Sequence, residues 1–135
     1  MANYYATTRS NYFRVKDATA FEAWCHTRSL DFWTKHYGGV GDRYAVSADT
    51  GDSAGWPCYD SKQDDIDLTG ELAKHLDPRD IAVLIEIGSE KLRYLTGIAT
   101  AVHHSGRTLH VDLNEIYDRA IDAFDGDLTV TDATH

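Results

Sequence analysis

Three histidines and an aspartate towards the C-terminal end of this 135-residue chain have the side chains best suited to metal or acid–base chemistry. A two-residue turn at Ser105-Gly106 would pair His103 with Thr108 and bring His103 and His110 onto one face of a hairpin, about 7 to 8 Å apart at Cα. Two imidazoles at that distance can converge on zinc. Exposed histidines beside a turn are the competing interpretation, because no His-Glu-x-x-His or Cys-x-x-Cys spacing supplies further ligands and we expect no cofactor. The four residues are His103, His104, His110 and Asp112.

The next segment carries acidic residues at helical spacing. Residues three or four apart share one side of a helix, so the carboxylates form an acidic stripe about 15 Å long. A DNA strand carries four or five phosphates over about that length. Asp122 and Asp125 would lie at the negative end of the helix dipole, at a cost of about 0.3 to 1 kcal/mol each, so helix stability does not explain them. A solvated helix face that serves solubility explains them equally well. The stripe consists of Glu115, Asp118, Asp122 and Asp125.

A second acidic group, Asp64, Asp65 and Asp67, precedes a helix predicted from about residue 68. Such residues cap helices and solvate loops. They also lack the spacing of a calcium-binding loop. With the stripe, these three aspartates are our candidate partner-binding residues.

Charge is divided unevenly along the chain, whose formal net charge is −9. Residues 1–44 carry 6 bases and 4 acids, whereas residues 45–90 carry 3 bases and 11 acids. Residues 91–107 carry 3 bases and no acid, and residues 108–135 carry 1 base and 7 acids. An acidic surface is repelled by nucleic acid and by anionic lipid. The charge therefore favours a basic protein as partner, with no direct contact to nucleic acid.

Composition predicts one folded domain over residues 1–135, with a short tail at 127–135. Hydrophobic residues make up 42% of the chain and aromatic residues 11%, which is typical of a chain with a core. The start lacks a secretory signal pattern, and the two cysteines allow at most one disulfide, so we expect a cytoplasmic protein with free thiols. The longest apolar run, residues 81–85, is too short to cross a bilayer.

Hydrophobic periodicity predicts an α+β fold, a mostly antiparallel sheet with two or three helices packed on one face. A helix should follow Asp17, another should run from about residue 68 to before Pro78, and a third should open at Asp112. Strands are expected at 11–16, 56–59, 81–87, 92–103 and 108–111, with a hairpin within 30–48. The nearly continuous aliphatic run at 81–87 indicates a buried central strand.

The hairpin register predicted from Ser105-Gly106 also assigns two faces to the last strands. Ile98, Val102, Leu109 and Val111 should lie on the core side. The opposite side would carry the small residues Gly97, Ala99 and Ala101, and we consider dimerisation through that side as a third hypothesis.

Three stretches of the sequence have the pattern of a known group of proteins. They are residues 11–17 with 20–24, residues 55–59 and above all residues 90–97, Glu-Lys-Leu-Arg-Tyr-Leu-Thr-Gly. The chain resembles a group of small acidic proteins of phages, plasmids and other mobile elements. The resemblance implies that the chain disables a host defence, such as a restriction or CRISPR system, by occupying a nucleic-acid groove.

We therefore expect a non-enzymatic acidic binding protein, an anti-defence inhibitor whose stripe and Asp64, Asp65 and Asp67 block a basic, nucleic-acid-binding host protein. Two alternatives stay open. One is a metal-dependent enzyme that uses His103 and His110, and the other is a homodimeric interaction module.

Overall fold

The structure is a computed structural model that describes residues 5–38, 42–48, 55–58, 62, 64–90, 94–131 and 133. Within these residues it has six strands and three helices, and the α+β class expected from the sequence is confirmed. The elements are β1 (Tyr5–Ser10), α1 (Ala18–Thr27), β2 (Leu30–His36), β3 (Asp42–Ala48), α2 (Leu68–His75), β4 (Ala82–Glu90), β5 (Tyr94–Val102), β6 (Thr108–Asp112) and α3 (Glu115–Ala123).

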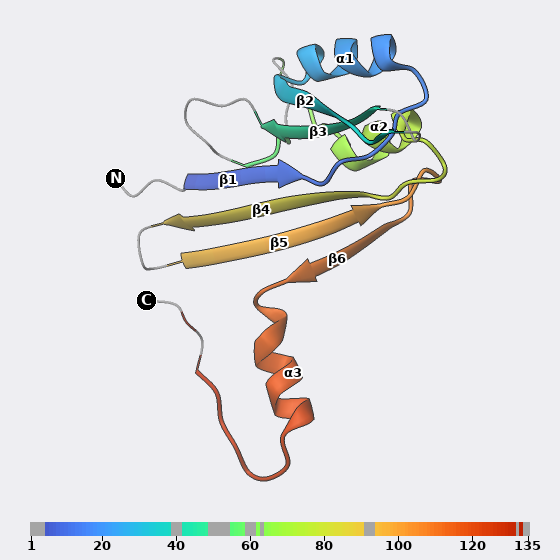
Figure 1. Cartoon of the computed structure of the whole chain (residues 1–135). Coiled ribbons are helices and arrows are strands. Elements are labelled where there is room, and N and C mark those ends of the chain that lie inside the picture. Colours follow the sequence, from blue (N-terminus) through green and yellow to red (C-terminus); the bar gives the residue numbers. More distant parts are fainter. Residues whose placement is uncertain are drawn as a thin grey trace.

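The strands form two antiparallel sheets, a four-stranded sheet in the order β1-β4-β5-β6 and the two-stranded hairpin β2-β3. Figure 1 shows that α1, α2 and the hairpin lie together on one side of the larger sheet, whereas α3 extends away beyond β6. These elements cover one side of the sheet over β1 and β4, which we call the covered side, whereas the same side is exposed at Thr108 and His110 of β6. No helix in the described part of the chain is long and apolar enough to span a membrane.

The core lies between the four-stranded sheet and the elements that cover it. Phe13, Phe21 and Leu76 are fully buried there, and Leu84 and Val102 contribute from the sheet itself. β1 is fastened to the hairpin by its own side chains, because Ser10 Oγ accepts a hydrogen bond from Val46 N at 2.8 Å and Thr8 Oγ1 accepts one from Ala48 N at 2.8 Å. One face of the sheet is therefore fixed by apolar packing and by hydrogen bonds.

The first two helices begin where the sequence predicts. Asp17 Oδ1 accepts a hydrogen bond from Ala20 N at 3.2 Å, and Asp67 Oδ1 accepts one from Gly70 N at 3.2 Å, so each aspartate satisfies an amide that the helix leaves unpaired. α2 ends at His75, before Pro78, as expected. These caps depend on local sequence alone, which is why they are predictable.

Two strand predictions are wrong. Residues 11–16 form only isolated bridges, Phe13 to Tyr44 and Val15 to Leu76, because this segment crosses from the sheet to the hairpin and places Phe13 in the core. Residues 55–58 are irregular, and residue 59 lies outside the described residues. β4 is central in the sheet, as predicted, but only one of its faces is buried.

Two carboxylates fix the covered side through arginines. Asp80 accepts hydrogen bonds from Arg14 N at 2.7 Å, Arg14 Nε at 2.9 Å and Arg14 Nη2 at 2.7 Å, and the Arg14 guanidinium lowers the pKa of Asp80 to about 2. Glu71 accepts from Arg28 Nε and from Trp24 Nε1, both at 2.8 Å, and its pKa is lowered chiefly by the bond from Arg28. The Glu71 contacts join α2 to α1. The Asp80 contacts join the 11–16 segment to the turn before β4.

Candidate interaction surface

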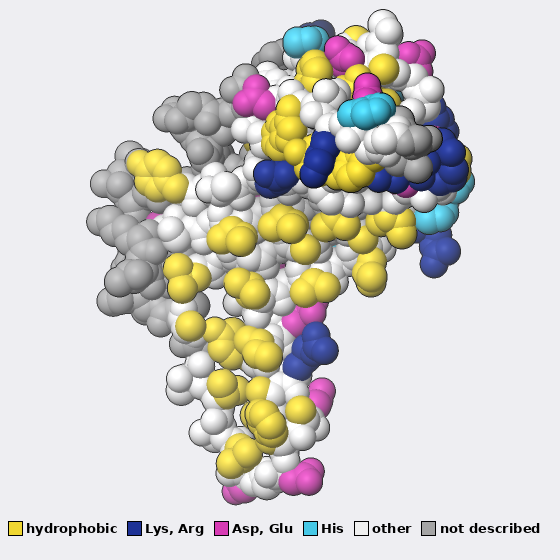
Figure 2. Space-filling model, viewed as in Figure 1, with side chains coloured by type: hydrophobic (Ala, Val, Ile, Leu, Met, Phe, Trp, Pro, Cys, Tyr) yellow, Lys and Arg dark blue, Asp and Glu magenta, His cyan; other side chains and the backbone are white. Residues whose placement is uncertain are grey.

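The other side of the four-stranded sheet is apolar and uncovered by any described element. Ile87 is 61% exposed and Leu109 is 70% exposed, although both belong to a regular strand. Figure 2 shows hydrophobic side chains spread across β4, β5 and β6 and continuing along α3. We call this side of the sheet the open face. Its residues, which alternate with those of the covered side, are Val83, Ile85, Ile87, Leu95, Gly97, Ala99, Ala101, Leu109 and Val111.

The open face has a trough along its middle strand. Gly97, Ala99 and Ala101 of β5 carry small side chains, and they pair with larger aliphatic residues of β4 on one side and of β6 on the other. The flanking strands lie about 10 Å apart, so the small residues of β5 leave room for large side chains between them. A shallow hollow of about 170 Å³ lies here, and its lining includes Ile85, Ala99 and Val111. The face is therefore shaped to accept large apolar side chains.

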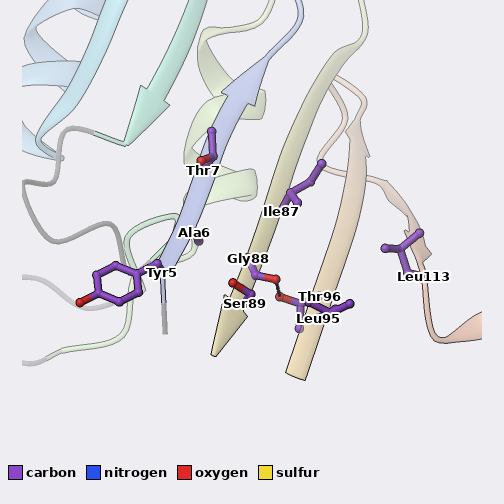
Figure 3. Close-up of a pocket in the computed structure, with 9 residues that line it drawn as sticks. All are labelled: Tyr5, Ala6, Thr7, Ile87, Gly88, Ser89, Leu95, Thr96 and Leu113. Atoms are coloured by element: carbon purple, nitrogen blue, oxygen red, sulfur yellow. Dashed lines mark hydrogen bonds between the residues drawn. The ribbon is translucent and has the colours of Figure 1, made fainter. Parts of the chain in front are cut away.

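A second hollow, of about 580 Å³, lies at the end of the sheet where β1 begins and β4 ends (Figure 3). Its lining includes Tyr5, Ile87, Leu95 and Leu113, and the Thr96 hydroxyl donates to the Gly88 carbonyl at 3.3 Å beside it. Leu113 covers Gly97, because a Cβ atom built on Gly97 would lie 2.5 Å from Leu113 Cδ1. The chain therefore leaves β6 on the open side of the sheet.

α3 is an amphipathic helix whose apolar side is not buried by any described part of the chain. Ile116 and Phe124 are 61% and 64% exposed, and no residue of α3 is buried. Asn114 precedes the helix without a side-chain cap, and Asp112 Oδ1 instead accepts from Asn114 N at 2.8 Å, so the predicted helix start at Asp112 is two residues too early. An amphipathic helix normally buries its apolar side, so α3 has the pattern of a binding element.

The register of the β5–β6 hairpin differs from the prediction by one residue. His103 N donates to Arg107 O at 2.9 Å, and Val102 pairs with Thr108, not with Leu109. Three residues therefore form the turn, and every β6 side chain changes face. Leu109 and Val111, predicted on the core side, lie on the open face, whereas Ile98 and Val102 are on the covered side as predicted.

The same shift separates the two candidate metal ligands. His103 has the strand parity of the open face, where its Nδ1 is 2.7 Å from Ser105 Oγ. His110 has the opposite parity and lies 3.0 Å from Thr100 Oγ1. His104 stacks on His103 with ring centroids 4.4 Å apart, and Asp112 turns towards Asn114. Within the described residues, no three His, Cys, Asp or Glu side chains are grouped for a metal.

The acidic candidates occupy two separate places. Glu115, Asp118 and Asp122 are exposed on α3, and Asp125 follows its last turn. On a helical projection they lie opposite the apolar residues of α3. Asp64, Asp65 and Asp67 precede α2, which lies with α1 at the other end of the molecule (Figure 1), so the two groups do not form one patch. Asp67 is used as the α2 cap.

Two described bases, Arg9 of β1 and Arg107 beside the hairpin turn, have the parity of the open face, but the Arg9 guanidinium lies against the Trp33 and Tyr12 rings. The acids of β4 and β6, Glu86, Glu90 and Asp112, have the opposite parity. The open face therefore differs in sign from the outer side of α3.

Arg9 also belongs to a basic-aromatic group that sequence spacing does not reveal. Its guanidinium carbon lies 5.2 Å from the Trp33 ring centre and 5.7 Å from that of Tyr12, and Trp33 Nε1 donates to Tyr12 Oη at 2.8 Å. Lys35 lies 5.2 Å and Arg43 4.6 Å from the Tyr37 ring centre. Such cation–π contacts hold the outer face of the hairpin against β1.

Comparison with protein-family models, with curated proteins and with solved structures returned no match to this chain. The fold and the surface define a small α+β protein with a half-covered antiparallel sheet and a projecting amphipathic helix.

Proposed function

We propose that this chain is a protein-binding protein whose binding surface is the open face together with the apolar side of α3. One observation carries this proposal: Ile85, Ile87, Leu109 and Val111 form an exposed aliphatic face on a regular sheet, continuous with an exposed apolar helix. Contiguous apolar surface of that extent marks interaction sites in folded proteins, whereas single exposed apolar residues do not.

The energetics support the same function. A large aliphatic side chain contributes about 1.5 to 3 kcal/mol when it is fully buried, so one that is half exposed has about 1 kcal/mol still to gain. About ten such side chains on the open face and α3 give on the order of 10 kcal/mol, which is comparable with the cost of association, about 4 to 15 kcal/mol. The partner's own apolar surface is buried in the same contact and adds a similar gain, so a partner that covers the whole surface can bind stably, but one that covers a few residues cannot.

A blocking substitution in the trough tests this function. Ala99→Lys places a charge at the middle of the open face without touching the core, and Thr19→Lys adds the same charge on exposed α1 as a control. The immobilised chain is mixed with untagged copies of itself and with an extract of its own host cells. We expect a protein, a second copy of this chain included, to be retained by wild type and Thr19→Lys but lost by Ala99→Lys. Equal retention by all three would contradict the proposal.

The acidic side of α3 supports a second candidate function, the binding of a basic protein. Glu115, Asp118 and Asp122 are exposed there, opposite the apolar side, so both surfaces can be used together. With the mobile-element resemblance, the partner would be a nucleic-acid-binding defence protein that the carboxylates block.

This second function is tested by charge reversal. A double variant, Asp118→Lys with Asp122→Lys, should lose a partner that is also released by salt, and should keep any partner that depends on Ala99. The isosteric pair Asp118→Asn with Asp122→Asn separates charge from shape and should show an intermediate loss. Unchanged binding with no salt dependence would exclude the acidic stripe as a binding site.

A further inference from the structure

We propose that the occupant of the open face is α3 of a second copy, so that two chains exchange helices in a symmetric dimer. This inference rests on the proposed function and names the partner. Each chain supplies both halves of the contact, an apolar trough and a projecting helix with an apolar side. Within the described residues, no element covers either half, and only Leu113 lies over the trough, at Gly97. A two-fold axis repeats both halves in the partner.

The dimensions of α3 match the face. Its nine residues span about 14 Å, which is the distance across four strands spaced about 4.8 Å apart. The helix does not fold back on its own sheet but points away from the β6 edge (Figure 1). Its apolar side is formed by Ile116, Tyr117, Ala120 and Ile121, and Phe124 follows its last residue.

The edge of the sheet shows where the second copy attaches. His103 N bonds Arg107 O and Leu113 N bonds Gly97 O, so the backbone groups of Leu109 and Val111 point towards β5. Those of Thr108, His110 and Asp112 therefore point outward from the edge strand β6. Three residues with His110 at the centre can pair antiparallel with the same three residues of a second copy.

Such pairing brings α3 to the partner's trough. The two-fold axis between two antiparallel β6 strands stands perpendicular to the sheet, so the open faces of both copies lie on the same side. The chain leaves β6 on that side at Leu113 and then passes beyond the edge. In the dimer, the space beyond the edge is occupied by the partner's β6, β5 and β4. α3 therefore lies over the partner's open face.

Charge at the start of α3 favours the same occupant. Antiparallel pairing centred on His110 places Leu113 of one copy opposite Arg107 of the other, so the acidic first turn of α3, with Glu115 and Asp118, begins beside a base. The contact is isologous and closes at two copies, which predicts a dimer and not a filament.

Sedimentation velocity at protein concentrations from 1 to 100 µM tests the exchange, and a mixture of two complementary variants extends the test. Wild type should sediment at twice the chain mass of 15.1 kDa. Ala99→Lys, which blocks the trough, and Ile121→Asp, which spoils the helix, should each shift to monomer by at least tenfold in dissociation constant. An equimolar mixture of the two variants retains one intact helix-in-trough contact, so dimer should reappear. Asp118→Asn, on the outer side of α3, should remain dimeric.

Three results would overturn the exchange. They are a wild type that is monomeric up to 100 µM, an Ile121→Asp variant as dimeric as wild type, and variants that stay monomeric when mixed. Ile116→Asp repeats the helix test, and circular dichroism confirms that each variant keeps the core. A monomeric wild type that still captures another protein in an Ala99-dependent way would overturn the exchange and leave the proposed function standing. A monomeric wild type that captures no protein would contradict both the exchange and the proposed function.

Discussion

The two sides of the four-stranded sheet both carry aliphatic residues, and these residues have opposite surroundings. On the covered side Leu84 is 4% exposed and Val102 is buried, whereas their neighbours Ile85 and Leu109 on the open face are 40% and 70% exposed. The difference arises from the connections between the strands, because α1, α2 and the hairpin all pack on one side. Within the described residues, the chain therefore supplies a cover for one apolar strand face and none for the other.

The largest expected effect is on the free energy of unfolding, which a substitution on the covered side should lower more than one on the open face. Leu76→Ala, in the core, should lower the free energy of unfolding by about 2 to 5 kcal/mol, because it leaves a cavity among buried side chains. Ile87→Ala, on the open face, should cost less than about 1 kcal/mol in the monomer. Urea unfolding at the lowest usable protein concentration measures both. Equal losses would mean that the open face is packed in the free chain.

The next effect concerns the ion pair that fixes the covered side. Asp80→Asn should lower the free energy of unfolding by about 2 kcal/mol at neutral pH, because folding lowers the pKa of Asp80 from its ordinary value of 3.8 to about 2. A lowered carboxyl pKa stabilises the fold above about pH 4, and this contribution is lost as pH falls towards 2. Thermal unfolding of wild type and variant should therefore converge in that window. A gap that stays constant to pH 2 would contradict the assignment.

A smaller effect is expected on self-association through the edge strand β6. His110→Pro removes an amide that points away from β5, so the hairpin should persist while pairing between two copies weakens. We expect at least a tenfold rise in the dimer dissociation constant, or about 1.4 kcal/mol. Sedimentation equilibrium measures it, with His104→Pro in the turn as the control. A dimer of unchanged affinity would show that β6 edges do not meet.

The smallest effect is expected on the outer side of α3. Asp122→Lys replaces an acid in the last turn of α3 by a base, which the helix dipole favours by about 0.3 to 1 kcal/mol. The helical signal of the chain should rise slightly, and self-association should fall by less than threefold. A loss of dimer as large as that of Ile121→Asp would mean that the acidic side of α3, and not the apolar side, makes the contact.

Local signals in the sequence predicted the caps well and long-range relations poorly. Asp17 caps α1 as expected, and Asp67, one of the acids expected at the start of α2, caps that helix, because a cap involves residues three apart. The cap expected at Asp112 is wrong, since α3 begins two residues later than predicted. The β5–β6 register failed because Ser105-Gly106 favours a two-residue turn, while His103 pairs with Arg107 across three residues. This shift of one residue in the pairing places Leu109 and Val111 on the open face and places His103 and His110 on opposite faces. The fold class was predictable, but the surface was not.

One signal for the surface was present in the sequence. The run 81–87 is apolar on both strand faces, which correctly predicted a central strand and wrongly predicted burial of both faces. The chain supplies helices for one face only, so a missing second layer could have been inferred from the count of elements. The basic-aromatic group of Arg9, Trp33 and Lys35 left no such signal, because its members are brought together by the hairpin.

Isotope-filtered NMR on a mixture of labelled and unlabelled chains tests the helix exchange most directly. We predict nuclear Overhauser contacts between the Ile116 or Ile121 methyl groups of one copy and the Ala99 or Ile85 methyl groups of the other. Contacts between these groups within one copy, or their absence between copies in a sample shown to be dimeric, would contradict the account.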